Sequence, residues 1–357
     1  MALVDRTSVG RSLALPLGRL RTGRRRFGRA GSGGQSLTAL LLLLPALCIL
    51  GVFHFFPLLY TLYISLHKWR FVDQGFVGLE NYRAALLSED FWSALANTGF
   101  FVLMTVPTTM AIAVVFAVML FRNVRFLAFF RTVFFLPYVT SSVAAAGVWA
   151  WIFNPHFGVA NQLLRYAGIG PLQWLQDPRG VLALLAAHFG LTLPVWAHGP
   201  SLALVAIAVM TVWSYLGFEI VIFLIGLGNI PTDVYEAARV DGAGALQIFR
   251  RISLPLLTPS LLLVSVITTI GAFQEFNRIY QMSTNANVGS HPGGPLGSTQ
   301  TLVVLVYNEF YSSLHIGYGA AIAFLLFGML LLLSLAQFAV AGRQRGGGMA
   351  ASKAARR

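Results

Sequence analysis

The sequence predicts an all-α polytopic membrane protein, and three observations support this fold class. Of its 357 residues, 57% are hydrophobic and only 10% are charged, which is too apolar for a soluble fold of this size. The hydrophobic residues come in long blocks. The 25 basic residues outnumber the 12 acidic ones and gather in tails and short loops beside these blocks, which favours membrane orientation over nucleic-acid binding.

Six segments are long enough to cross a bilayer. A hydrocarbon core of about 30 Å needs roughly 20 apolar residues in a helix. The predicted spans are residues 37–63, 91–121, 126–153, 201–227, 256–280 and 317–341. Helix kinks are expected where prolines lie within them, and these are Pro45, Pro57, Pro107, Pro137 and Pro259.

The two ends of the chain are predicted to be basic tails. Residues 1–35 hold eight arginines among glycines and serines, so we expect a disordered cytoplasmic tail. A signal peptide is disfavoured because the apolar run that follows is long and no small-x-small cleavage site closes it. Residues 36–342 form the predicted transmembrane domain, and residues 343–357 a second basic cytoplasmic tail.

The segment from Val181 to Ala197 is a borderline seventh span, interrupted by His188, Gly190 and Pro194. With six spans, both termini and 19 of the 25 basic residues lie in the cytoplasm. A seventh span would place two basic segments outside the cell, the polar loop at 228–255 and the C-terminal tail. That arrangement goes against the positive-inside bias. We therefore predict an external insertion at about 178–200, with an interfacial or re-entrant piece lying on the core.

The polar loop at 228–255 has the pattern of two short helices joined by a glycine turn. Asp233 is predicted to cap the first helix, with Glu236 as its third residue. Gly242 and Gly244 are expected to leave this helix with positive φ. A second amphipathic piece follows, with an apolar side of Ile248, Phe249 and Ile252. Small alanines beside a glycine turn suit docking against another protein, although an ordinary interfacial helix is the alternative.

This loop resembles the EAA loop of binding-protein-dependent ABC importer permeases. The sequence Glu236-Ala237-Ala238 is followed by Gly242 after three residues, and by Ile252-Ser253-Leu254-Pro255 after nine more. The resemblance implies a cytoplasmic coupling helix that inserts into a cleft of a separate ATPase subunit. The residues expected at that contact are Glu236, Ala237, Ala238, Asp241, Gly242, Ile252, Leu254 and Pro255.

The resemblance extends over residues 37–341 and is nearest to the maltose and glycerol-phosphate type of permease. The external turn after the third predicted span matches at Asn154, Pro155, Phe157, Gly158 and Asn161. The segment before the last span matches at Gly293, Gly294, Pro295, Thr299, Thr301, Leu302, Tyr307, Gly317 and Tyr318. The departures are the insertion around 180–200, an extension at 285–291 and the arginine-rich N-terminal tail.

The resemblance implies a multi-pass permease of the bacterial cytoplasmic (inner) membrane that imports a di- or oligosaccharide or a related polyol. Its implied partners are a second homologous permease, two copies of an ATPase subunit, an external sugar-binding protein and membrane lipid. ATP and Mg²⁺ would be bound by the ATPase. We expect no cofactor in this chain and no enzymatic activity, because a phosphate-binding loop needs a lysine after its glycines and the two lysines, Lys68 and Lys353, lie elsewhere.

Polar residues inside the predicted fourth and fifth spans are candidates for substrate binding, since such groups are costly in a membrane. By resemblance, substrate contacts fall on these two helices and point to Trp213, Gly217, Thr268 and Gly271. The full candidate set is Trp213, Gly217, Glu219, Thr268, Gly271, Gln274 and Glu275. Helix packing is the competing explanation, and Glu275 is expected to pair with Arg278.

Other functions remain as alternatives. An ABC permease for a glycerol phosphate-type substrate would keep the same fold. A proton-coupled secondary transporter could use Glu219 and Glu275, but it would need inverted repeats that we do not find. A membrane-embedded protease or glycosyltransferase is disfavoured because the sequence has no GxSG motif and no paired intramembrane aspartates. The single Cys48 and seven scattered histidines do not favour a metal site.

Overall fold

The computed structural model describes residues 32–121, 125–194, 197–285 and 292–354. The chain divides into two compact units, residues 1–57 and 58–357. The predicted disordered tail therefore lies mostly outside the described residues. Within it, residues 32–35 already belong to helix α1 (Ser32–Leu50). At the other end, the backbone of helix α16 continues to Ala354, through most of the predicted second tail.

The first unit ends within a long apolar helical segment, whose residues 58–65 belong to the second unit. Helix α1 passes Pro45 without a break and continues through a π-helical turn, Gly51–Phe55, into α2 (Phe56–Ser65). Large apolar side chains are exposed along it, including Leu42 and Phe53. An exposed apolar helix of this length suits a lipid environment.

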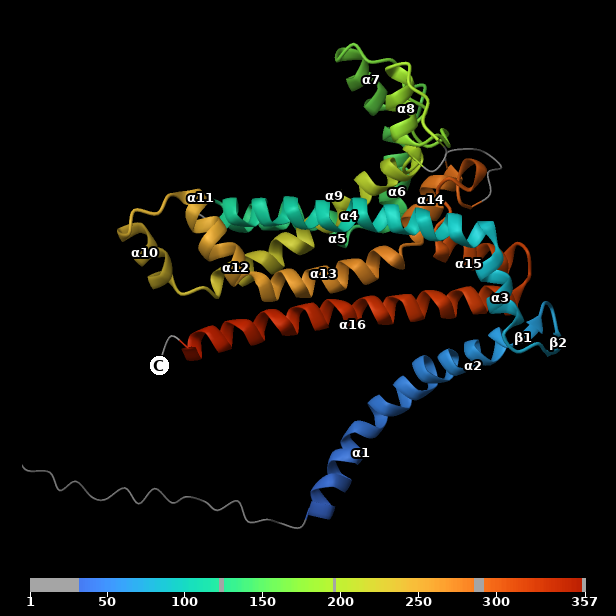
Figure 1. Ribbon diagram of the computed structural model, residues 1–357, viewed down its shortest axis with the longest axis horizontal. Coiled ribbons are helices and arrows are strands. Elements are labelled where there is room, and N and C mark those ends of the chain that lie inside the picture. The colour runs from blue at the N-terminus through green and yellow to red at the C-terminus, as the bar shows by residue number, and fades with distance from the viewer. Residues whose placement is uncertain (1–31, 122–124, 195–196, 286–291, 355–357) are drawn as a thin grey trace, which may run out of the picture. The chain divides into compact units, whose positions relative to one another are not determined.

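The second unit is a helical bundle with a small hairpin (Figure 1). Its elements are β1 (His67–Trp69), β2 (Asp73–Phe76), α3 (Glu80–Leu87), α4 (Glu89–Phe121), α5 (Leu127–Val139), α6 (Ser142–Ile152), α7 (Val159–Tyr166), α8 (Val181–His188), α9 (Leu202–Gly228), α10 (Thr232–Val240), α11 (Ala245–Ile248), η3 (Phe249–Ser253), α12 (Leu254–Leu256), α13 (Thr258–Phe273), α14 (Asn277–Asn285), η4 (Pro295–Gly297), α15 (Leu302–Tyr311) and α16 (Ile316–Ala354). The strands β1 and β2 pair antiparallel.

Four helices in the described part of the chain are long and apolar enough to cross a membrane: residues 39–65, α4, α9 and residues 316–340 of α16. Two bent helix pairs pass the same test, so the described residues hold four to six candidate spans. The prediction of a membrane-spanning helical fold is confirmed at this level.

The third and fifth predicted spans are not single helices. The third bends by 94° between α5 and α6, where Pro137 lies in the last turn of α5 and the Ser141 hydroxyl accepts a bond from the amide of Ala144 to start α6. The predicted 256–280 helix ends at Phe273. A carboxylate oxygen of Glu275 then accepts the amide of Arg278 at 3.2 Å and starts α14. Both breaks occur where a side chain satisfies the amides of a new helix.

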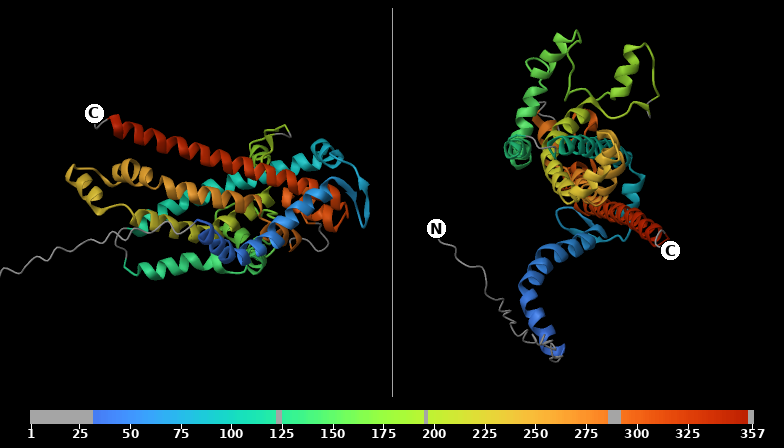
Figure 2. Two further views of the ribbon diagram at one scale, coloured as in Figure 1. Left: turned by 90° about the horizontal axis from the view of Figure 1, so that it is seen from below. Right: turned by 90° about the vertical axis from the view of Figure 1, so that its left-hand side faces the viewer.

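Helices α4, α9 and α13 run side by side, with α5 and α16 alongside (Figures 1 and 2). One buried cluster joins α4, α9 and α13 near the polar loop and contains Ala113, Ile220, Phe223 and Leu257. A second cluster lies toward the other end of the bundle and includes Phe101, Leu204 and Ile279. A third joins α4 to α15 and α16 through Phe91, Leu302 and Ile322. Burial of these side chains holds the bundle together.

The insertion is a closed excursion from the bundle. Gly180 and Ser201 form an antiparallel bridge, so the chain leaves and returns at one place. The helix within it, α8, has eight residues and is not among the candidate spans. The expectation that this piece lies on the core is wrong, because α7 and α8 stand off from the bundle (Figures 1 and 2) and leave Leu182, Leu185 and Phe189 exposed.

Candidate functional site

The polar loop between α9 and α13 begins with helix α10, whose start differs from the prediction. The N-cap is Pro231, with no side-chain cap, and Asp233 lies inside the first turn. The fixed φ of Pro231 positions the chain for helix entry without a polar cap. The carboxylate of Asp233 instead lies near the positive end of the helix dipole.

The end of α10 is a glycine-dependent turn. Gly242 has φ +77°, the amide of Ala243 donates to the carbonyl of Ala238 at 2.9 Å, and the amide of Gly242 donates to the carbonyl of Arg239 at 3.1 Å. These two bonds form a Schellman motif, which requires a left-handed residue at Gly242. The predicted positive φ is therefore confirmed for Gly242. It is wrong for Gly244, which is extended with φ −68° because one left-handed residue completes the turn.

Contacts on the inner side of the loop hold it to the bundle. The hydroxyls of Tyr235 and Ser253 lie 3.3 Å apart, and the rings of Tyr235 and Phe121 have centroids 6.2 Å apart. The predicted apolar side of the second piece is half-buried, and consists of Ile248, Phe249 and Ile252. The loop is thus fixed against the end of α4.

The outer side of the loop is exposed and partly apolar. Val240 is 86% exposed and Leu246 is 68% exposed. Among the signature residues, Ala238 is buried and Ile252 half-buried, whereas the exposed ones are Glu236, Ala237, Asp241, Gly242, Leu254 and Pro255. An exposed apolar surface held on a fixed loop is suited to contact with another protein.

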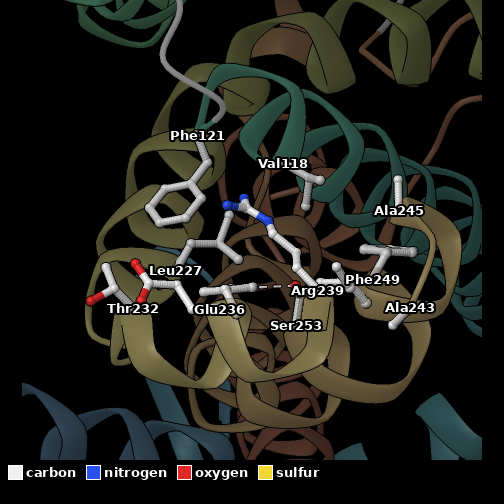
Figure 3. A pocket seen from close by; sticks show the side chains of 12 residues that line it. Val118, Phe121, Leu227, Thr232, Glu236, Arg239, Ala243, Ala245, Phe249 and Ser253 are labelled. Carbon is white, nitrogen blue, oxygen red and sulfur yellow. Dashed lines mark hydrogen bonds between the residues drawn. The ribbon is translucent and has the colours of Figure 1, made fainter. Parts of the chain in front are cut away.

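A cavity of about 730 Å³ lies between α10, η3 and the adjoining ends of α4 and α9. Figure 3 shows Arg239 reaching across it toward Phe121 and Val118, while Glu236 lies beside Thr232. One wall is apolar and the opposite wall carries both charge signs. The cavity therefore belongs to the loop and is separate from the predicted membrane site.

In the membrane, the structure joins two of the predicted substrate residues to each other. The Thr268 hydroxyl donates to a carboxylate oxygen of Glu219 at 2.9 Å, and both residues are buried. The sequence offered no partner for Glu219. The second Glu219 oxygen has no hydrogen-bond partner among the residues that the structure describes.

The two candidate glycines lie at close helix contacts. A Cβ at Gly217 would lie 1.8 Å from the carbonyl oxygen of Phe134, and a Cβ at Gly271 would lie 3.3 Å from the Tyr215 hydroxyl. Gly217 thus permits close approach of α9 to α5, as small residues do in membrane helix pairs. Its position agrees with the packing explanation that the sequence left open.

Gln274 and Glu275 follow the end of α13 that is farther from the polar loop, and Trp213 lies near the middle of α9. Trp213 is 38% exposed and its ring centroid is 5.6 Å from that of Trp149. Gln274 is exposed at the C-cap of α13. Glu275 forms the expected ion pair with Arg278, and both are buried.

Tyr138 of α5 joins this region through aromatic residues of α9, a contact that was not predicted from the sequence. The Arg278 guanidinium lies 4.9 Å from the ring centroid of Tyr215, a cation–π contact. Tyr138 stacks on Phe218 with centroids 4.8 Å apart and lies 6.1 Å from Tyr215. The available signal was the position of Tyr138 directly after Pro137, where the third span breaks.

No group of three or more histidine, cysteine or acidic side chains able to hold a metal occurs in the described ranges.

The sequence is similar to that of known transport proteins. No protein-family model matches the chain. The chain is 31% identical over 300 residues to a probable ABC transporter permease protein of Pyrococcus horikoshii, covering 83% of this chain and 92% of that protein. It is 31% identical over 307 residues to the trehalose/maltose transport system permease protein MalF of Thermococcus litoralis, covering 85% and 93%. It is 31% identical over 304 residues to the lactose transport system permease protein LacF of Rhizobium radiobacter, covering 84% and 92%.

Solved structures share the fold. A chain of a bacterial alginate ABC transporter, crystallised with an alginate pentasaccharide-bound periplasmic protein, aligns with a TM-score of 0.67 and 19% identity over 85% of this chain and 93% of that chain. The relatives confirm the resemblance that the EAA-type loop indicated. On these identities and coverages, the chain belongs to the family of ABC transporter permease proteins that includes the sugar permeases MalF and LacF.

Proposed function

We propose that this chain imports a di- or oligosaccharide, or a related polyol, as one of two permease subunits of an ABC importer of the bacterial cytoplasmic membrane. An external solute-binding protein delivers the sugar, and two ATPase subunits that bind ATP and Mg²⁺ drive transport. Each bent helix pair counts as one span, which gives six spans and places both termini in the cytoplasm. The named relatives for trehalose/maltose and lactose support the sugar class.

The observation that carries this proposal is the exposed polar loop at one end of the bundle. The loop of α10 and α11 lies at the same end of the second unit as the C-terminal end of α16, and opposite β1, β2 and α3 (Figure 1). Arg239, Arg250 and Arg251 are exposed on it. Basic loops face the cytoplasm in membrane proteins, so this end is the one that reaches the ATPase subunits.

Charge favours a neutral sugar over a phosphorylated one. The cation beside the candidate substrate residues, Arg278, is buried and paired with Glu275. A paired guanidinium offers little net charge to a phosphate. Exposed aromatic and amide groups nearby, Trp213 and Gln274, instead suit stacking against a sugar ring and hydrogen bonding to its hydroxyls.

Closure of the ATPase subunits would move the polar loop and, with it, α9 and α13. Rotation of these helices would alternate the access of the sugar site between the two sides of the membrane. The chain needs no reacting group of its own for this cycle. Its contribution is to bind the sugar and to convert movement of the loop into movement of the spans.

Substitution of Gly242 tests the coupling role. Gly242→Asp places a charge on the exposed turn after α10, and we expect loss of sugar uptake and of ATPase co-purification with normal membrane insertion. Gly242→Asn is the matched control, because asparagine tolerates the left-handed backbone and adds a side chain of the same size without the charge. If the Asp variant keeps both its ATPase and its uptake, the coupling role is refuted.

A further inference from the structure

Three contacts between α9 and α13 lie in one antiparallel seam. Gly226 faces Ser260, Glu219 bonds Thr268, and Tyr215 faces Gly271. On α9, the contacts run backward along the chain from Gly226 to Glu219, about two helical turns, and then to Tyr215, about one more turn. On α13, they run forward from Ser260 to Thr268 and then to Gly271 over about the same distances. The two helices that flank the polar loop are therefore in contact from Tyr215 to Gly226 of α9 and from Ser260 to Gly271 of α13. We define this set of three contacts as the seam.

The seam is tight at the end near the polar loop. A Cβ at Gly226 would lie 2.5 Å from the Ser260 hydroxyl oxygen and 2.8 Å from a methyl carbon of Leu257. Leu257 is fully buried. A side chain at Gly226 would have to displace the ends of the Ser260 and Leu257 side chains, so glycine allows the closest approach of α9 to α13 here.

In its middle, the seam depends on one hydrogen bond. Glu219 is 0% exposed, and its bond to the Thr268 hydroxyl is 2.9 Å long. A buried carboxylate in an apolar bundle needs such a partner, because leaving it unsatisfied is costly. Separation of α9 from α13 at this level would remove the Thr268 partner. The side chain of Glu219 also has no exposed surface with which to contact a sugar in this conformation.

We propose that Glu219 and Thr268 are positioning residues that keep α9 and α13 together as one rigid body throughout the transport cycle. This inference rests on the proposed coupling role of the loop. The loop leaves α9 after Gly228 and joins α13 at Thr258, so a force on it could spread the two helices apart. The seam prevents this spreading and passes the movement to both helices at once.

A disulfide across the seam gives the first test. The single native cysteine is replaced by Cys48→Ala, and Gly226→Cys is combined with Ser260→Cys. An ideal Cβ at Gly226 lies 3.2 Å from the Cβ of Ser260, a few tenths of an ångström short of the distance that a disulfide spans. The assay is sugar uptake by the full complex in proteoliposomes, before and after oxidation.

We expect the disulfide to form and uptake to stay within about twofold of the reduced sample. If oxidation stops uptake and a reductant restores it, the helices must separate during transport and the proposal is overturned. Failure of the cysteines to cross-link in the intact complex would overturn it too. The single Gly226→Cys variant shows whether the substitution itself is tolerated.

Three variants without a cross-link give a second test. Glu219→Leu and Thr268→Val remove the bond, whereas Glu219→Gln keeps an oxygen that accepts from Thr268. We expect the Leu and Val variants to keep hydrolysing ATP but to move about tenfold less sugar per ATP. A change of about tenfold in an equilibrium corresponds to the free energy that one buried hydrogen bond contributes. The Gln variant should restore the ratio.

A sugar-binding role for Glu219 would give a different result: the apparent KM for sugar would rise with the sugar-to-ATP ratio unchanged, and this outcome would refute the seam. Failure of the coupling proposal is also distinguishable. It would appear as no ATPase associated with the unmodified chain, before any seam variant is examined.

Discussion

Gly217 offers the sharpest distinction between a packing residue and a sugar-binding residue. In Gly217→Ala, the added methyl carbon would lie 1.8 Å from the Phe134 carbonyl oxygen. Carbon–oxygen contacts across helix interfaces normally lie near 3.3 Å. Helices α5 and α9 would therefore have to separate by about 1.5 Å, and the shift must come from backbone because the neighbouring atoms are backbone atoms.

The free-energy change has two parts. Overpacking a close contact costs roughly 1–3 kcal/mol, and a backbone shift of this size points to the upper end. Alanine is favoured over glycine in a helix by about 1 kcal/mol. Gly99→Ala is the matched control, because Gly99 lies in helix α4 and a Cβ there meets no atom within 4 Å. The difference between the two variants then isolates the overpacking cost, about 3 kcal/mol.

The assay is the thermal unfolding midpoint of the purified complex in detergent, measured together with the sugar concentration that gives half-maximal uptake. We expect Gly217→Ala to unfold several degrees below Gly99→Ala. The reasoning is refuted if both variants unfold at the same temperature. A selective rise in the half-maximal sugar concentration would then return Gly217 to the sugar site.

Three further predictions concern the buried polar groups outside the seam. The Arg179 guanidinium holds the pKa of Asp177 below its usual value, mainly through their hydrogen bond. The ionised carboxylate of Asp177 should therefore protect the Arg179 amide from hydrogen exchange above about pH 4. This protection should be lost as pH falls through the lowered pKa of Asp177. In Asp177→Asn, the exchange of this amide should show no such pH dependence. Asn161→Ala removes bonds to Pro155, Leu172 and Trp174 and should lower the unfolding free energy by more than about 2 kcal/mol, with unchanged stability as the contradicting result. Glu275→Gln should destabilise the protein by roughly 3–5 kcal/mol, because it leaves Arg278 buried without its anion. The double variant Glu275→Leu with Arg278→Leu should be destabilised less. Equal unfolding midpoints for the single and double variants would count against this pairing.

Local features of the polar loop were predictable from the sequence because short-range chemistry determines them. Gly242 has the positive φ expected of a residue that ends a helix in a Schellman turn. Ile248, Phe249 and Ile252 form the inner, half-buried side as their spacing indicated. Asp233 was mistaken for a cap because several residues can start a helix, and the choice of Pro231 depends on the path of the chain from α9.

The breaks in the third and fifth spans were not predictable from hydropathy. A window of apolar residues measures length and composition, and residues 126–153 satisfy both. Their 94° bend depends on where Ser141 can bond the amide of Ala144, a choice made by tertiary packing. The same holds for Glu275: its pairing with Arg278 was expected from their spacing, but the helix boundary between them was not.

The way in which α9 and α13 face each other narrows the set of residues that could contact a sugar under the proposed function. The sequence places polar residues on both helices and makes them candidates for substrate binding. In the structure, Glu219 and Thr268 satisfy each other, and Gly217 is covered by α5. The candidates left with exposed polar or aromatic surface are Trp213 and Gln274, both away from the polar loop. On the proposed function, we expect sugar contacts to involve these two residues and the middle of α9 and α13 to transmit the movement.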